Sequence, residues 1–558
     1  MFGNPVSRTF GRQYFEYMRM WLEVAEKDEF AEVAGLVEWG CLAWAAQRGD
    51  EVDGVFVRLA LEFRHQSTDG RLGWWTPGEV RRLLLEWIPD SVASGPETYP
   101  LALGSVRALL GYLDASGLLD PRGGTAADCL AEVDAVGPRY LELVREPKTP
   151  GAATIVMRAA FERGLDLADS EAVRTFLQDV KAGRTELDAG LIAQVLDGPR
   201  DEPPARKAPV LPVHVPDEAE LRAAAESCGF LAMMREGIPP HELTYLEAWA
   251  EATGPAEGDV VEVWRRALLA LLELEAAATE GSLFRVIYRD AVPDLLHTLY
   301  GMAAPVSAFS LAEATWLNCL RTEHPFLPTT AAERELSHAD LLGGVGDVLD
   351  GLELLGAITV EDPEGLPFVA LTPLATAILR GEYLAEGREA GRIGELTGAP
   401  PAGLLGVLVD HYPPDAAREE LALWLAAHGD DPAPLLEAIR DCPFHGRAAA
   451  LLWALTSDLE TGPALLESLR TDPVLAPLAL TRLTDLGTVG LDDLTEAEGG
   501  LVLAENFLTL LERRGPAALT ARLAQLPDDS RQHVVASVLA SGHPDEQGLT
   551  AFRAALTG

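Results

Sequence analysis

Apolar residues recur at helical spacing through most of this 558-residue sequence, and this pattern constrains the fold more than any other feature. Near the start, one helix face would collect Phe10, Tyr14, Tyr17, Met18, Trp21, Leu22 and Ala25. We therefore expect residues 1–196 to form an N-terminal helical domain. Further stretches of the same period lie at residues 30–47, 51–66, 77–88, 98–114, 125–144, 151–163, 169–181 and 186–197.

The sharpest local helix signal in this region is "WWTPGEVRRLLLEWIPD". Thr76 can cap a helix whose first position is Pro77, because a threonine hydroxyl accepts a free backbone N–H there and proline needs none. The Ile88-Pro89 step is expected to end this helix.

The segment "DGPRDEPPARKAPVLPVHVPD" is too rich in proline for a helix and lacks the alternation of a strand. It predicts a Pro-rich linker over residues 197–216. Helical patterning then resumes, for example in "HELTYLEAWAEATG", and predicts a middle helical domain over residues 217–305.

The clearest β signal lies between two helical stretches. "AITV" and "PFVAL" flank "EDPEGL", a turn of Asp, Pro and Gly, so a hairpin is expected. Helix, hairpin and helix in this order resemble a winged helix, with Leu341 to Leu355 in the position of the recognition helix. Residues 306–398 are therefore expected to form a winged-helix-like module.

The charge of this module argues against DNA reading. Between residues 306 and 372 the only strong cations are Arg321 and Arg334, and the expected hairpin tip carries Glu361, Asp362 and Glu364. A DNA reader needs cations on phosphates and Arg, Lys, Asn or Gln at base edges. We interpret the module as a structural or protein-docking winged helix.

The C-terminal third repeats itself. "APLLEAIRD" (433–441) aligns with "PALLESLRT" (463–471), so that Leu435 corresponds to Leu465, 30 residues later. Each repeat is a helix pair that cannot bury its apolar face alone, which favours stacking. Residues 399–558 are therefore expected to form HEAT-like helical repeats.

The matched repeats place Glu437 with Arg440, and Glu467 with Arg470, at equivalent positions. Such i,i+3 pairs contribute roughly a few tenths of a kcal/mol, so ordinary surface electrostatics would account for them. Their recurrence on one face of the repeats also makes these four residues the candidate partner-binding residues.

The overall charge is strongly negative, with 87 Asp and Glu against 44 Lys and Arg, a formal net charge of −43. Such a field repels phosphate backbones and anionic lipid, which argues against nucleic-acid and membrane partners and favours a protein partner with a basic surface. Solubility alone, adaptation to a salty cytoplasm, or mimicry of DNA would each also account for this acidity.

The cysteines and the N-terminus indicate a cytoplasmic location. Cysteine occurs five times, dispersed and without a CxxC pair, at Cys41, Cys129, Cys228, Cys319 and Cys442. The first residues mix Arg with aromatic residues and lack the apolar core of a signal peptide. The most apolar later stretch, "ALLALLELEAAA", is too short to span a bilayer.

The common catalytic and cofactor motifs are missing. No lysine follows glycine as a Walker loop requires, and GxSxG does not occur. "GGVGDVLDG" (343–351) departs from a dinucleotide fingerprint, and "HELTY" (241–245) has Tyr245 where a zinc helix needs its second His. "CPFH" (442–445) lacks a second ligand pair. We therefore predict no catalytic residue, cofactor or metal site.

The segments "HQSTDGRLGWWTPGEVRRLLLEWIPDSV" and "LPVHVPDEAELRAAAESCGFLAMM", with "HELTYLEAWAEATG" after them, resemble large proteins encoded by high-GC Gram-positive (actinobacterial) bacteria. The resemblance covers most of the first 380 residues. It implies a bacterial, cytoplasmic protein with helical and winged-helix-like parts, and it implies no catalytic residue.

Together these patterns predict a mainly α, multi-domain helical protein with a winged-helix-like α/β module and a C-terminal HEAT-like α-solenoid. The function expected of it is that of a non-enzymatic, acidic adaptor for protein–protein interaction, with a regulatory role as one option. The first alternative is a winged-helix transcriptional regulator that binds DNA through a localised Arg patch, formed by Arg81, Arg82, Arg107 and similar residues. The second is an enzyme whose site assembles from dispersed residues.

Overall fold

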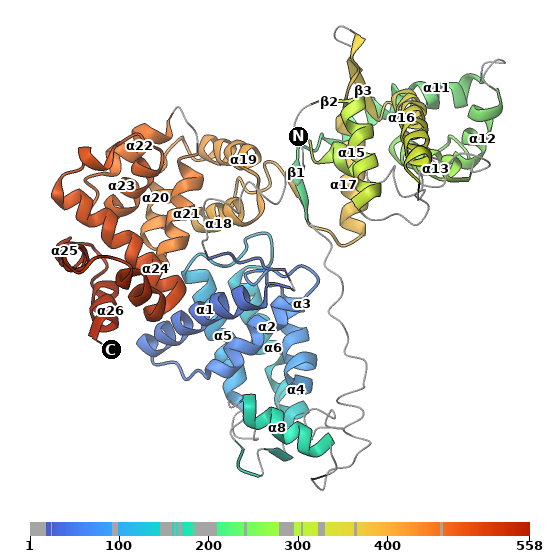
Figure 1. Ribbon diagram of the computed structural model, residues 1–558. Helices are drawn as coiled ribbons and strands as arrows, with labels where there is room; N and C mark the ends of the chain where they lie inside the picture. Colours follow the sequence, from blue (N-terminus) through green and yellow to red (C-terminus); the bar gives the residue numbers. More distant parts are fainter. Residues whose placement is uncertain are drawn as a thin grey trace. The chain divides into compact units, whose positions relative to one another are not determined.

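The chain is mainly helical, as its periodicity predicted, and its described residues form two small sheets (Figure 1). The computed structural model describes residues 18–557 apart from 24, 92–98, 146–158, 161–162, 166–169, 182–183, 185–208, 239–242, 278–294, 303–304, 322–329, 362–364 and 458–460. The helix expected over 186–197, most of that over 151–163, and residues 197–208 of the expected linker lie outside the described residues.

The chain divides into two compact units. Unit 1 contains residues 1–207 together with 394–558, and unit 2 contains residues 208–393. The expected N-terminal domain and the expected repeats thus belong to one unit, and the expected middle domain and almost all of the winged-helix-like module to the other. Each unit has its own buried apolar core.

Unit 1 begins with helices that bury one apolar face each. Thr76 caps α3 as expected, because its hydroxyl accepts the Glu79 N–H at 3.2 Å. The N-terminal elements are α1 (Lys27–Arg48), α2 (Gly54–His65), α3 (Pro77–Arg82), the π-helical turn η1 (Leu83–Trp87), α4 (Ile88–Ser91), α5 (Tyr99–Ala115), α6 (Ala126–Arg145) and α8 (Ser170–Lys181).

Pro89 does not end the helix at Ile88, so that expectation is wrong. Helical structure continues through Pro89 to Ser91. In a regular helix a proline ring clashes with the carbonyl group four residues earlier. Here that residue is Leu85, within the wider π-helical turn, which relieves the clash.

The expected helix face that includes Met18, Trp21 and Leu22 is also wrong for the described residues. Residues 18–22 are not helical: Trp21 forms a β-bridge with Arg71, and the Leu72 N–H donates to the Met20 carbonyl at 2.8 Å. Met18, Met20 and Leu22 are buried. Tertiary pairing with residues 70–72 satisfies this backbone and overrides the local helical period.

The second part of unit 1 is a succession of helices joined by short connections. Its longest helix, α24, bends at Gly515, where φ is 72°, and Pro516 comes next in the chain. Phe444 of this part is buried in the core of the N-terminal helices, so the two parts share apolar packing. The elements are α18 (Pro401–His411), α19 (Pro414–Ala427), α20 (Ala433–Arg440), α21 (His445–Leu455), α22 (Gly462–Leu469), α23 (Ala476–Asp485), the 3-10 turn η3 (Leu491–Asp493), α24 (Glu496–Ala524), α25 (Asp528–Ala540) and α26 (Glu546–Thr557).

Unit 2 combines helices with the expected hairpin. In its three-stranded sheet the order is β2-β4-β3, with all neighbours antiparallel, and Ile358 pairs with Leu371. The elements are β1 (Val210–Val213), α10 (Glu218–Glu226), α11 (Gly229–Glu236), α12 (Leu243–Thr253), α13 (Val260–Ala277), β2 (Val306–Ser307), α15 (Ala308–Arg321), α16 (Ala331–Leu354), β3 (Ile358–Glu361), β4 (Phe368–Leu371), α17 (Pro373–Ala385) and β5 (Ala390–Arg392).

Part of the expected linker is a strand, which corrects the prediction for residues 210–213. β1 pairs in parallel with β5, with Val210 beside Ala390. Pro212 cannot donate a backbone hydrogen bond, which is tolerated because β1 has a described neighbour on one side only. Strands of three or four residues are too short to show the alternation of apolar and polar residues by which a longer strand is recognised in a sequence.

Candidate functional site

The four residues predicted for partner binding lie toward the ends of two helices, α20 and α22. Glu437 and Arg440 belong to α20, and Glu467 and Arg470 lie at the end of α22. The i,i+3 pairs form, at 2.9 Å for Arg440 and 3.1 Å for Arg470. The structure thus brings together the members of each pair.

Each of these arginines also pairs with an acid further along the chain. Arg440 contacts Asp472 at 2.8 Å, and Arg470 contacts Glu498 at 2.7 Å. The second partners are not at equivalent positions of the repeat, so the repeat pattern gave no signal for them. Both arginines therefore connect their helix to a later part of the chain. Glu437 and Glu467 are more exposed than the arginines, so they are more accessible to a partner protein.

Replacing Arg440 with alanine tests this connecting role. We expect the free energy of unfolding to fall by at most about 1 kcal/mol, because the pairs are partly solvated. Glu437→Ala, which removes only the pairing within α20, should cost less, and urea unfolding followed by tryptophan fluorescence would compare them. Equal effects of the two variants would contradict a link through Asp472.

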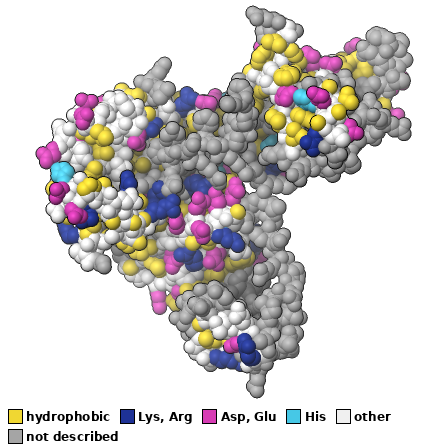
Figure 2. Space-filling view, in the orientation of Figure 1, with side chains coloured by type: hydrophobic (Ala, Val, Ile, Leu, Met, Phe, Trp, Pro, Cys, Tyr) yellow, Lys and Arg dark blue, Asp and Glu magenta, His cyan; other side chains and the backbone are white. Residues whose placement is uncertain are grey.

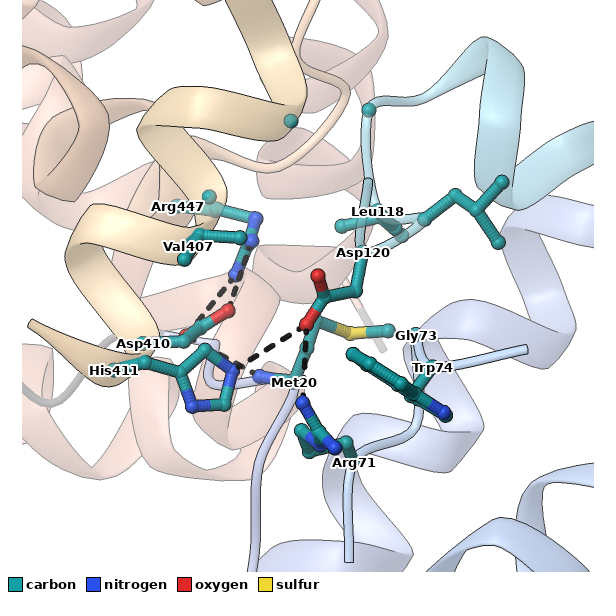
Figure 3. Close-up of a pocket in the computed structure, with 14 residues that line it drawn as sticks. Met20, Arg71, Gly73, Trp74, Leu118, Asp120, Val407, Asp410, His411 and Arg447 are labelled. Carbon is teal, nitrogen blue, oxygen red and sulfur yellow. Dashed lines mark hydrogen bonds and ion pairs between the residues drawn. The ribbon is translucent and has the colours of Figure 1, made fainter. Parts of the chain in front are cut away.

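Buried charged side chains meet in a small pocket of unit 1 (Figure 3). Asp410 at the end of α18 accepts from Arg447 of α21 at 3.0 Å, and both side chains are almost fully buried. Arg447 also donates to the Met18 carbonyl at 3.1 Å. These bonds fasten the start of the described chain to α18 and α21.

Asp120 is the second carboxylate of this pocket, and cations lie around it. It contacts Arg122 at 2.8 Å, Arg71 at 3.8 Å and the His411 ring at 4.0 Å. Burial raises the pKa of Asp120, but Arg122, His411 and Arg71 outweigh burial and lower the pKa to about 2. The Arg71 guanidinium also lies 3.6 Å from the centre of the Trp74 ring.

The pocket is too small for a metabolite. Its space of about 20 Å³ accommodates one water molecule. A histidine and two buried carboxylates do meet here, which the enzyme alternative requires, but the carboxylates are engaged by Arg122 and Arg447. The arrangement is that of an ion-pair junction between distant parts of unit 1.

A second polar cluster joins α21, α24 and the turn between α25 and α26. Glu505 accepts from His445 Nδ1 at 3.0 Å and from His543 Nε2 at 2.9 Å. His445 Nε2 donates to Asp545 at 2.9 Å. Glu512 accepts the backbone N–H groups of His445 and Gly446 at the first turn of α21. We call His445, Glu505, His543 and Asp545 the histidine cluster.

The histidine cluster has the residue types of a metal site, since ligand atoms of His445, Glu505 and His543 lie within 4.8 Å of one another. The hydrogen bonds of the cluster, however, place protons on the histidine nitrogens that a metal would need as ligand atoms. Both ring nitrogens of His445 face carboxylates, so both carry protons. His543 Nδ1 accepts the Asp545 N–H at 3.1 Å, which leaves the proton on Nε2, the atom that faces Glu505. A metal would have to displace both protons that point at Glu505.

The electrostatics agree with a charged His445. Burial lowers the pKa of His445, but its hydrogen bonds to Asp545 and Glu505 outweigh burial and raise the pKa to about 10. Burial raises the pKa of Glu505, while the two histidines lower it to about 2. The cluster is thus a buried imidazolium held between two carboxylates.

One of the short chemical motifs of the sequence, "CPFH", contributes a residue, His445, to the histidine cluster. Within "CPFH", His445 contacts carboxylates rather than Cys442, whose thiol faces the Phe444 carbonyl at 3.7 Å. "GGVGDVLDG" lies inside α16, so it is no phosphate loop. His241 of "HELTY" lies outside the described residues. The histidine cluster spans 100 residues of sequence, so no local spacing could have identified it.

No family model matches the chain, and no curated protein or solved structure is significantly similar to it. No described helix combines the length and apolarity needed to cross a bilayer.

Proposed function

We propose that the chain is a non-enzymatic adaptor that docks a protein with a basic surface onto α15 and α16. The carrying observation is a set of exposed apolar side chains on these helices: Phe309 is 64%, Leu317 52% and Leu336 73% exposed. Figure 2 shows hydrophobic and acidic side chains intermixed over this part of unit 2. Large apolar side chains that are exposed on a surface serve as anchors in many protein-binding sites.

The fold around this surface supports a winged-helix-like module. A strand, two helices and a hairpin succeed one another in residues 306–371, and β4 lies between β2 and β3. The succession of helices from α18 to α26 likewise supports a HEAT-like array, whose long surfaces suit protein partners. A cytoplasmic, bacterial protein remains part of this proposal.

The charge of the module supports a protein rather than DNA as partner. Asp350 and Glu353 are exposed on α16 and Glu361 on β3. Between residues 306 and 372 the sequence has eleven acids and two arginines. Each phosphate of a duplex would be repelled by this surface, whereas Lys or Arg at the edge of an apolar patch would be attracted.

The three arginines named for the DNA-binding alternative each pair with an acid. Arg81 pairs with Glu132 at 2.7 Å, Arg82 with Glu79 at 3.1 Å and Arg107 with Asp134 at 2.5 Å. Each cation would have to exchange an acid for a phosphate, so we retain no DNA-binding function for them.

Copurification at native expression levels tests the adaptor function. We expect a stoichiometric protein partner whose recovery falls about tenfold or more with Leu336→Asp, because a carboxylate in an apolar contact leaves a buried charge on binding. Trp39→Asp, at a 71% exposed residue of unit 1, is the matched control and should retain the partner.

Recovery that is equal for the two variants would contradict docking at α16. Sequence-selective capture of a duplex fragment by the purified chain would favour the transcriptional regulator instead.

A further inference from the structure

Unit 2 contains an open groove lined by methionine at the ends of α11 and α12. Its volume is about 460 Å³, in the range of ligand-binding clefts. Met233, Met234 and Ile238 line one side, and Glu247, Ala250 and Ala256 line the other. Glu247 and Ala250 are three residues apart on α12, so they share a helix face.

The helices that carry this methionine groove are joined by buried aromatic contacts. Phe230 of α11 stacks on Trp249 of α12 with ring centres 3.6 Å apart. The Trp249 N–H donates to the Ala267 carbonyl of α13 at 2.7 Å, and both rings are fully buried. These contacts hold α11 against α12 before anything binds, which lowers the entropic cost of binding.

Met233 and Met234 make the lining of the groove adaptable. Methionine has three rotatable bonds and a polarisable sulfur, so it fits apolar side chains of different shape. Two of the seven methionines of the chain are adjacent here, and neither is fully buried. Grooves of this kind suit the apolar stripe of an amphipathic helix.

The acidic residues around the groove favour a positively charged binding partner. Glu247 lines it, and Glu236, Glu251 and Glu257 are exposed on the flanking segments. Between residues 229 and 259 the sequence has six acids and one cation, Arg235. A cationic segment is attracted to this rim and an acidic segment is repelled.

We propose that the methionine groove binds a basic amphipathic helix of a partner protein, with apolar side chains on Met233 and Met234 and Lys or Arg beside Glu247. This inference deepens the proposed adaptor function and rests on it. It adds a second docking surface, on helices other than α15 and α16.

The test uses the full chain and a fluorescent 18-residue helical peptide of leucine and lysine. We expect micromolar binding by anisotropy that weakens about tenfold or more with Ala250→Glu, because this change places a carboxylate in the apolar lining. Ala248→Glu adds the same charge on an exposed face of the same helix and is the matched control, expected within about twofold of the parent chain. Methyl NMR of the methionines should show shifts confined to Met233 and Met234.

Three outcomes would overturn the proposal: no binding below millimolar peptide, equal effects of the two alanine variants, or equal binding of a peptide with glutamate in place of lysine. Circular dichroism of both variants shows whether they fold. The Leu336→Asp copurification experiment separates this proposal from the adaptor function. If Leu336→Asp abolishes partner recovery but the parent chain does not bind the peptide, only the groove proposal fails.

Discussion

Replacing Arg447 with methionine is expected to lower the free energy of unfolding by about 3–5 kcal/mol. The change leaves Asp410 buried without its cation and removes a donor from the Met18 carbonyl. Methionine retains much of the side-chain volume, so the effect reports charge rather than a cavity. Urea unfolding, followed through the eleven tryptophans, measures it.

The exposed pair of Arg418 and Asp415 offers a matched control. Arg418→Met should cost at most about 1 kcal/mol, because water solvates both charges in either state. Replacing Arg447 and Asp410 together, by methionine and leucine, should recover much of the loss since no unpaired charge remains. A double variant as unstable as Arg447→Met alone would refute the ion pair as the cause.

Replacing His445 with glutamine is expected to cost about 3–5 kcal/mol near pH 6, because Glu505 and Asp545 lose the charge between them. The pKa of His445 rises from 6.5 unfolded to about 10 folded, so its contribution is complete below pH 6.5 and is lost as the pH rises toward 10. The variant should therefore lose the alkaline fall in stability that the parent chain shows.

Glu505 determines the acid side of the same dependence of the free energy of unfolding on pH. Its pKa falls from 4.5 unfolded to about 2 folded, so its contribution is present above pH 4.5 and is lost as the pH falls toward 2. Glu505→Gln should flatten this acid limb. His533→Gln, at an exposed histidine of α25, is the control and should leave the profile unchanged. Identical pH profiles for the parent and His445→Gln would exclude a buried imidazolium.

Local signals predicted the local structure well. The Thr76 cap, the Pro77 start and the pairing of β3 with β4 depend on a few neighbouring residues, so one sequence suffices to identify them. The helical period failed where distant pairing replaced it, at Trp21 beside Arg71. It also failed to show β1, whose partner β5 lies about 180 residues further along the chain.

The charged clusters could not be predicted for a related reason. Carboxylates are so frequent in this chain that neither Asp410 nor Glu505 differs from its neighbours in sequence. Only folding makes them distinct, by burying them beside Arg447 or between His445 and His543. The repeat alignment predicted the i,i+3 pairs of Arg440 and Arg470, which form, but the second partners of these arginines arise from packing.

The parallel pairing of β1 with β5 bears on how such a chain could have arisen. Residues 210 and 390 are neighbours across this pairing, so the incoming and outgoing ends of unit 2 are separated by little more than the length of a three-residue strand, roughly 10 Å. A segment with adjacent ends can be inserted into a surface loop of another protein without distorting that host. Unit 2 therefore has the geometry of an inserted domain, which a single recombination event can add to a host protein or remove from it.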